Sequence, residues 1–222
     1  MCRMTLARFR WADIMTHMLE VLGRANSINV QKVMWCAAEL DLAVTRHDIG
    51  GAFGGTDTAE FSKLNPNRQI PVLRDGDFAL YESNAIVRYL CASYGAEWQP
   101  GNPKDFGTAN PWMDWYLTTM HPPMTTLFWQ LVRTAKADRD YAAISEAFAT
   151  CRTYWAQVDR HLSERAYLLG SDISMADIPL GCSAYRWHGL DIDRPALPGL
   201  HAWYKRLCQR SAYRDHVMLP LT

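Results

Sequence analysis

Two short motifs place ligand-binding groups at the ends of predicted elements. In the first, Pro71 heads the short apolar strand Val72-Leu73. Proline has no N–H to give to a β-ladder, so this position indicates an edge strand or a cis bond, and it leaves the backbone of Ile70 open to a ligand. In the second, Glu82 and Ser83 stand directly before apolar residues at helical spacing, which predicts that a helix begins there with Ser83 as its cap.

The second motif suits a small ligand that carries both an ammonium and a carboxylate group. The carboxylate of Glu82 can accept from an ammonium, while the hydroxyl and backbone N–H of Ser83 can hold a carboxylate at the positive end of a helix. Considered without any relative, the simpler interpretation is that Ser83 only caps its helix.

The elements that position these motifs alternate between strand and helix. Hydrophobic periodicity and turn residues predict, in order, a strand at Met18 to Leu22, a helix through Val30 to Leu40, a strand at Ala43 to Ile49, a glycine-rich loop at 50–55, one or two helical turns at Thr58 to Leu64, strands at Pro71 to Arg74 and Phe78 to Tyr81 around Asp75-Gly76-Asp77, and a helix from Ser83 to Tyr94. The order β-α-β-α-β-β-α, with a parallel crossover first and a hairpin last, is that of a thioredoxin-like sheet.

The remainder of the chain reads as helical. Residues 96–107 contain Pro100, Gly101 and Pro103 and are predicted to be a linker. Beyond them, helical segments are expected at Thr108 to Ala135, at Tyr141 to Leu162, from Ser174, and from about Pro198. Ser174 and Asp177 form a variant of the capping box, with Ile173 and Ile178 placed as a hydrophobic staple, so both polar residues are expected to be structural.

The Ile70-Pro71 and Glu82-Ser83 motifs together resemble those of the cytosolic glutathione transferases, in particular bacterial theta-like and nu-like members, and the resemblance covers about Met18 to Pro220. It implies an α/β N-terminal thioredoxin-like domain at 18–95 and an all-α C-terminal domain at 108–222. It also implies that Pro71 is cis, that the backbone of Ile70 pairs with the cysteinyl unit of glutathione, and that Glu82 and Ser83 hold the γ-glutamyl end.

In that family the first helix of the second domain builds one wall of the electrophile pocket. The residues here that form an approximate i, i+3, i+4, i+8 stripe are Trp112, Trp115, Tyr116 and Met120. Core packing or a dimer face accounts for each of them equally well. The resemblance further implies a homodimer.

Glutathione attacks only as a thiolate, so a protein must lower a thiol pKa of about 8.5. The turn between the first strand and the first helix is the place for this, because it lies beside a helix N-terminus. It contains no cysteine, which argues against a dithiol oxidoreductase. The relatives use Ser, Thr or Asn there, so Ser27 is the first candidate donor, Asn26 the second and Asn29 the third. Ser27 also suits a simple helix cap.

The glycine carboxylate of glutathione needs a cation or donors near the loop before Pro71, where Arg68 and Gln69 are available. Many relatives have a basic residue where this chain has Gln69. That departure weakens the charged contact or transfers it to Arg68.

Composition excludes several other classes of partner. The 23 basic and 23 acidic residues cancel, which gives no electrostatic case for nucleic acid or an anionic membrane. No long apolar stretch predicts a membrane span, and the histidines and cysteines follow no metal-binding spacing. We therefore expect a cytoplasmic protein without metal, in which residues 1–17 are a disordered extension.

The leading hypothesis is a detoxifying transferase in which glutathione, the co-substrate, attacks a small hydrophobic electrophile by substitution or addition. One alternative is a glutathione-dependent disulfide or peroxide reductase of the nu-like type. The other is a non-catalytic interaction protein that keeps the fold.

Overall fold

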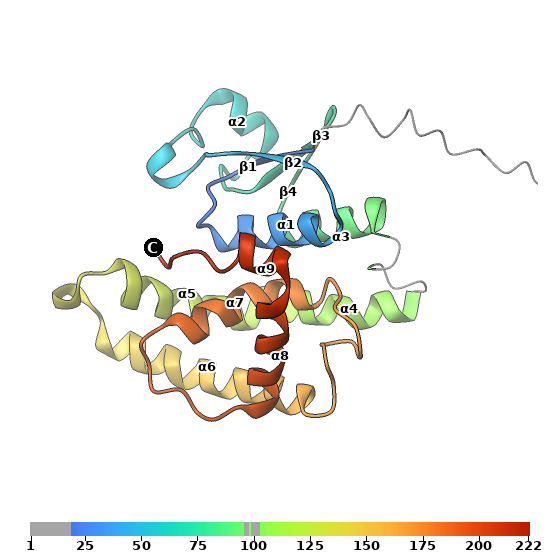
Figure 1. Ribbon diagram of the computed structural model, residues 1–222. Coiled ribbons are helices and arrows are strands. Elements are labelled where there is room, and N and C mark those ends of the chain that lie inside the picture. Colours follow the sequence, from blue (N-terminus) through green and yellow to red (C-terminus); the bar gives the residue numbers. More distant parts are fainter. Residues whose placement is uncertain (1–18, 96–97, 99–102) are drawn as a thin grey trace, which may run out of the picture.

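The computed structural model describes residues 19–95, 98 and 103–222. The expected extension at 1–17 and half of the expected linker, residues 96, 97 and 99–102, lie outside these residues. Figure 1 shows a sheet with helices α1 and α3 between it and a larger helical domain, and α2 on the opposite face of the sheet. In the described ranges, no helix is long and apolar enough to cross a membrane.

The sheet has the predicted topology. Strands β1 (Leu19–Leu22), β2 (Val44–His47), β3 (Val72–Asp75) and β4 (Phe78–Tyr81) lie in the order β2-β1-β3-β4. The pair β1 and β2 is parallel, whereas β3 is antiparallel to both β1 and β4. The register pairs Leu22 with Val72, and this brings Pro71 beside the end of β1.

Three helices complete this domain: α1 (Ile28–Glu39), α2 (Ala59–Leu64) and α3 (Ser83–Tyr94), with a 3-10 turn η2 at Gly51–Phe53. Thr58 caps α2, since its hydroxyl accepts from the amide of Phe61 at 3.1 Å. The expectation that Ser83 caps α3 is wrong. Ser83 is the first helical residue, and Glu82 occupies the cap position with φ of 70°.

The helical domain contains α4 (Pro103–Trp115), α5 (His121–Phe128), α6 (Tyr141–Leu162), α7 (Asp177–Gly189), α8 (Pro198–Gln209) and α9 (Ser211–His216), with a 3-10 turn η5 at Lys136–Asp138. Helix α4 begins inside the segment expected to be a linker, because proline at the first helical position is compatible with a helix start. Helix α9 was not anticipated.

Helices α4 and α5 belong to one continuous helical run that ends at Arg133. Two segments of this run are π-helical, η3 (Tyr116–Met120) and η4 (Trp129–Arg133). The first precedes Pro122 and Pro123, which lack the amide hydrogens that an α-helix would donate to carbonyls four residues earlier. The ladder shifts accordingly, and the amide of His121 donates to the carbonyl of Tyr116. Segments of this kind often lie at functional sites.

The larger of two hydrophobic core clusters spans both domains, and the smaller one contains Leu22, Phe61 and Val72 of the first domain. Trp35 of α1 is fully buried and meets the ring of Tyr213 of α9 edge-on, with centroids 4.7 Å apart. A Cβ on Gly181 of α7 would lie 2.6 Å from the Trp35 ring, so the small residue permits this close approach. Helix α1, and with it the turn that precedes it, is therefore fixed by the second domain as well as by the sheet.

The structural role expected for Ser174 and Asp177 is present. The carboxylate of Asp177 is fully buried and accepts from the amide and hydroxyl of Ser174, from the amide of Leu168 and from the indole of Trp203. These contacts join the start of α7 to the preceding loop and to α8, so the carboxylate holds three segments of the helical domain together.

Candidate active site

The turn between β1 and α1 is held against the sheet by its backbone. The amide of Gly23 donates to the carbonyl of His47 at 2.9 Å, and the amide of Arg24 donates to that of Ile49 at 3.0 Å. A Cβ on Gly23 would lie 2.5 Å from Val30 and 3.3 Å from the Cβ of Ile70. The absence of a side chain therefore lets the turn lie directly beside the residue that precedes Pro71.

Ser27 occupies the N-cap of α1 with extended backbone angles, yet its side chain makes no capping hydrogen bond. The residue as a whole is half-buried. Its hydroxyl thus lies at the positive end of a helix without being used by that helix, which is the arrangement a thiolate donor requires.

Asn26 is engaged through both ends of its amide. Its Nδ2 donates to the hydroxyl of Thr222 at 2.7 Å, and its Oδ1 accepts from the guanidinium of Arg24 at 3.4 Å. Thr222 also accepts two hydrogen bonds at its backbone oxygen, from Nε and Nη2 of Arg133 at 3.2 and 2.9 Å. The last residues of the chain therefore tie η4 to the β1–α1 turn.

Asn29 joins the first turn of α1 to the first turn of α3. Its Oδ1 accepts from Nζ of Lys32 at 3.0 Å and from the hydroxyl of Ser83 at 3.3 Å. Lys32 Nζ also lies 3.4 Å from Ser83 Oγ. Sequence reasoning did not identify Lys32. The available signal was its position between Ile28 and Cys36, which puts a lysine on the buried face of the helix.

Lys32 is fully buried and lies over the ring of Tyr116, with Nζ 4.5 Å from the centroid. Burial lowers the pKa of this lysine to about 8, and the charge of Arg186 acts in the same direction, whereas Cys182 and Glu82 oppose it. The group is therefore still largely a cation at pH 7, enclosed behind Ser83.

The peptide bond between Ile70 and Pro71 is cis, as the resemblance implied. The loop before it is held by Asn65, whose Nδ2 donates to the carbonyl of Gln69 at 2.8 Å and whose Oδ1 accepts from the amide of Asn67 at 2.9 Å. Arg68 has φ of 53°, and the side chains of Arg68 and Gln69 are exposed.

Glu82 is exposed and has φ of 70°, an uncommon conformation for a residue with a side chain. Its carbonyl accepts from the amide of Ile86 at 2.9 Å, so α3 begins normally behind it. Ser83 is buried. At the start of α3, the exposed carboxylate of Glu82 and the buried hydroxyl of Ser83 therefore belong to adjacent residues.

The four residues expected to form a pocket wall are divided by the structure. Tyr116 and Met120 are fully buried, and the Tyr116 hydroxyl lies 3.0 Å from Nδ1 of His121. Trp112 packs against His161 of α6 with ring centroids 4.5 Å apart, and Trp115 packs against Tyr154 of the same helix at 5.7 Å. The first pair presents no surface to a ligand in this conformation, so a role for these four in an electrophile pocket stays a prediction.

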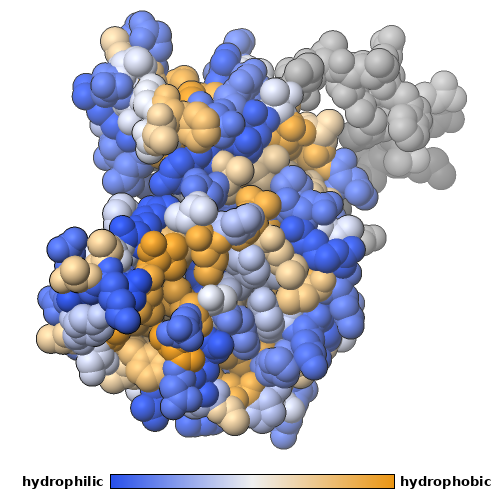
Figure 2. Space-filling model, turned by 60° about the vertical axis from the view of Figure 1, so that its left-hand side comes forward, coloured by the Kyte–Doolittle hydropathy of each residue, from blue (hydrophilic) through white to orange (hydrophobic). Residues whose placement is uncertain are grey.

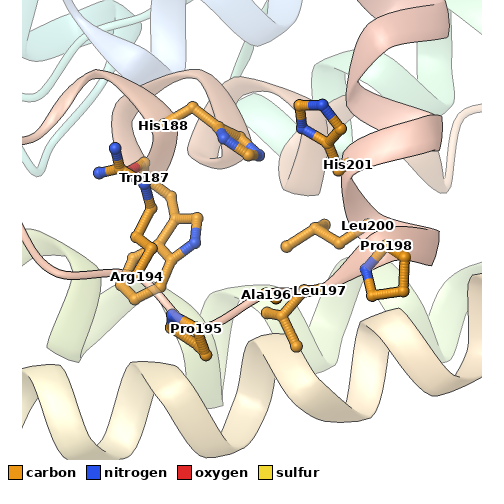
Figure 3. Close-up of a pocket in the computed structure, with 9 residues that line it drawn as sticks. All are labelled: Trp187, His188, Arg194, Pro195, Ala196, Leu197, Pro198, Leu200 and His201. Carbon is orange, nitrogen blue, oxygen red and sulfur yellow. The ribbon is translucent and has the colours of Figure 1, made fainter.

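A separate cavity of about 540 Å³ lies at the end of α7, the following loop and the start of α8. Figure 3 shows His188 and His201 on one side of it and Pro195 of the loop on the other. It contains none of the residues discussed above. Within the described part of the chain, there is also no group of three or more His, Cys, Asp or Glu residues arranged to hold a metal ion.

A four-stranded mixed sheet flanked by helices, a cis-proline loop facing a helix start, and a second domain of helices define the two-domain architecture of the glutathione transferases. Family comparison agrees: residues 26–93 match the glutathione S-transferase N-terminal domain, and residues 141–206 match the glutathione S-transferase C-terminal domain. The chain belongs to the glutathione S-transferase family.

Individual relatives match over nearly the whole length. Glutathione S-transferase GstB of Escherichia coli is 35% identical over 209 residues, which span 92% of this chain and 100% of the relative. Glutathione S-transferase 3 of Zea mays is 30% identical, with 90% and 93% covered. The theta class enzyme of Xanthomonas axonopodis pv. citri, solved with glutathione bound, superposes with a TM-score of 0.90 at 44% identity, covering 93% and 100% of the two chains.

Proposed function

We propose that this protein is a glutathione S-transferase that conjugates the thiolate of glutathione to small hydrophobic electrophiles. One observation carries the proposal: three motifs that are separate in sequence converge. Ile70 lies against Gly23 of the β1–α1 turn, and Ser83 donates to Asn29 in the first turn of α1. A tripeptide that spans these groups would place its thiol over the N-terminus of α1.

The roles follow from the chemistry of each group. The backbone of Ile70 has no hydrogen-bond partner among the described residues and is offered to the cysteinyl unit of glutathione. Glu82 accepts from the γ-glutamyl ammonium, and Ser83 with the N-terminus of α3 holds the adjoining carboxylate. Arg68 and Gln69 are the donors assigned to the glycine end.

Ser27 is the proposed principal donor to the thiolate, because its hydroxyl is free at the start of α1. Asn26 is second, since its amide already donates to Thr222. Asn29 is third, as its Oδ1 is filled by two donors. A pKa drop of about two units corresponds to roughly 2.7 kcal/mol, which one charge-assisted hydrogen bond and a helix N-terminus supply together.

In the reaction the sulfur forms a bond to an electrophilic carbon, and a leaving group departs with its electron pair or, in an addition, the pair moves onto the acceptor. The test is retention on immobilised glutathione followed by parallel turnover of a chlorinated aromatic and a small disulfide. Conjugation of the aromatic supports the proposal. Turnover of the disulfide alone would favour a reductase. The absence of both glutathione binding and turnover would rule out both enzyme functions.

The proposal includes a cytoplasmic homodimer that uses glutathione where this thiol is abundant and reduced. The dimer follows from the family resemblance. Light scattering of the purified full chain checks it, and a monomeric mass at micromolar concentration would contradict it.

A further inference from the structure

Three arginine side chains near the β1–α1 turn influence one another electrostatically, and among the described residues none of them forms an ion pair with an aspartate or a glutamate. They come from the turn itself, from the end of η4 and from α7: Arg24, Arg133 and Arg186. The arginines that do form ion pairs among the described residues are Arg46, Arg74, Arg88 and Arg210. The positive charges in such a cluster repel one another, so the cluster favours the binding of an anion.

Arg186 is the least solvated member of the cluster. Only 8% of its surface is exposed, and within the described residues its guanidinium has no hydrogen-bond acceptor. It lies over the ring of Phe128 with Cζ 3.8 Å from the centroid. Burial lowers the pKa of Arg186 to about 10, and the charges of Arg133 and Arg24 add to the effect. A buried cation without a counter-ion is costly, and an anionic ligand would relieve that cost.

Arg133 lies close to Arg186. Its Cζ is 5.0 Å from the same Phe128 centroid and 4.7 Å from that of Trp129. Because both arginines contact one ring, their charges are separated by no more than the sum of the two distances to it. Arg133 in turn reaches Thr222, which is bonded to Asn26 in the turn. The pair of cations therefore borders the region where the thiolate is proposed to lie.

The surroundings of the two arginines are apolar and partly open. Trp129 is 51% exposed, whereas Phe128 is buried. Figure 2 shows a notch between the two domains on this side of the molecule, with hydrophobic residues gathered beside it. Such a region suits a small organic molecule that is apolar at one end and charged at the other.

We propose that the electrophile of this enzyme carries a carboxylate next to the carbon that the thiolate attacks, and that Arg186 and Arg133 bind this carboxylate. The inference rests on the proposed transferase function. In the reaction the sulfur–carbon bond forms as the bond from carbon to a halide breaks, the halide leaves with the electron pair, and the carboxylate is unchanged. A planar guanidinium binds a carboxylate through paired hydrogen bonds. Its positive charge also offsets the repulsion between the negatively charged carboxylate and the thiolate.

The competing explanation is that these arginines bind a carboxylate of glutathione itself. The two explanations differ in what a variant changes. If the arginines bind the electrophile, Arg186→Met affects ligands with a charged S-substituent and spares glutathione. If they bind glutathione, every ligand weakens together.

The experiment measures binding of S-(carboxymethyl)glutathione, S-(carbamoylmethyl)glutathione and glutathione to the full chain by calorimetry. The first two ligands differ only by the charge at the electrophile position. We expect the wild-type protein to prefer the carboxymethyl ligand by about tenfold or more, as for one charge-assisted hydrogen bond. Arg186→Met abolishes that preference. The matched control is Arg152→Met, since exposed Arg152 of α6 also lies over an aromatic ring, that of Phe148 at 5.8 Å.

Equal binding of the two conjugates by the wild-type protein, alongside firm binding of glutathione, overturns this inference and leaves the transferase function intact. Failure of all three ligands to bind overturns both. An Arg186→Met variant that weakens glutathione as much as the carboxymethyl ligand also overturns it. If Arg186→Met does not fold, two other variants test the inference. Arg133→Met must reduce the preference for the carboxymethyl over the carbamoylmethyl ligand, and Arg186→Lys must retain most of that preference.

Turnover provides a second measurement. Chloroacetate and chloroacetamide share a leaving group and an attacked carbon. The ratio of their kcat/KM values, divided by the ratio of their uncatalysed rates with glutathione, is expected to exceed about ten for the wild-type enzyme and to approach one for Arg186→Met. A normalised ratio near one in the wild-type enzyme is the contrary result.

Discussion

The Nζ of Lys32 lies 3.4 Å from the hydroxyl oxygen of Ser83, and both groups contact Oδ1 of Asn29. A fully buried cation is thus enclosed directly behind the hydroxyl that is proposed to hold the γ-glutamyl carboxylate. Its only polar contacts in the described residues are this hydroxyl and this amide, with the Tyr116 ring on another side. Lys32 is therefore a positioning residue that also contributes charge.

Replacing Lys32 by methionine is expected to weaken glutathione binding by about tenfold, because the carboxylate loses a nearby charge and Ser83 loses a fixed neighbour. The effect falls on KM for glutathione, with kcat changed much less. The unfolding free energy is expected to stay equal or rise, since a buried cation is replaced by an apolar chain of similar length.

Steady-state kinetics and chemical denaturation of Lys32→Met check this pair of expectations. Lys205→Met, on the exposed surface of α8, is the matched control. A drop in stability large enough to account for the loss of binding would assign Lys32 a purely structural role.

The pKa of Lys32 gives a pH dependence with a definite sign. The folded protein holds this pKa near 8, against 10.5 for an ordinary lysine, because of burial. Between these values the unfolded chain binds more protons than the folded one, so the penalty for burying Lys32 is present below pH 8 and is relieved as the pH rises toward 10.5. The stability of the wild-type protein relative to Lys32→Met is therefore expected to rise across that window.

Ligand binding is expected to change in the opposite direction. S-methylglutathione has no titrating thiol, and its other ionisations are common to both proteins. The ratio of its dissociation constants for Lys32→Met and wild type is expected to be largest below pH 8 and to shrink above it. Glu82, Cys182 and Arg186 also influence this lysine, but each is present in both proteins. A ratio independent of pH would show that the charge does not act on the ligand.

Much of the fold follows from local sequence signals. The helices Ser83–Tyr94 and Tyr141–Leu162 have the predicted bounds, because apolar periodicity and polar residues at their starts act within a few positions. The thioredoxin-like topology followed from the order of the elements, with a parallel crossover first and a hairpin at Asp75-Gly76-Asp77 last. Helix α4 was misplaced, since Pro103 begins a helix where proline and glycine content had suggested a linker.

The parts of the site that were not anticipated depend on long-range contacts. A lysine in a helix is ordinarily solvated, and only the packing of α7 and Tyr116 over Lys32 makes it a buried cation. The contact of Arg133 with Thr222 joins residues 89 positions apart, and no local pattern encodes it. The π-helical segment η4, which ends at Arg133, likewise has no sequence signature comparable to a cap or a turn.

Ser27→Ala is expected to reduce kcat/KM for conjugation by about 100-fold, the effect of removing one hydrogen-bond donor from a developing or stabilised anion. The pKa of bound glutathione rises toward its value in water. Ultraviolet absorbance of the thiolate, followed against pH in the binary complex, measures that shift. Asn26→Ala serves as comparison, because its amide already donates to Thr222. If Asn26→Ala shifts the thiol pKa and Ser27→Ala does not, the principal donor is Asn26.

Asp177→Ala is expected to lower the unfolding free energy by about 3 kcal/mol or more, because it leaves buried donors without an acceptor at the start of α7. The carboxylate is far along the chain from Ser27 and joins only segments of the helical domain. Turnover per folded molecule should therefore persist at low temperature. Asp172→Ala, on the exposed loop before the helix, is the control and should change stability by less than about 0.5 kcal/mol. A stable Asp177→Ala protein with impaired glutathione binding would instead connect this capping residue to the active site through α7, which carries Arg186.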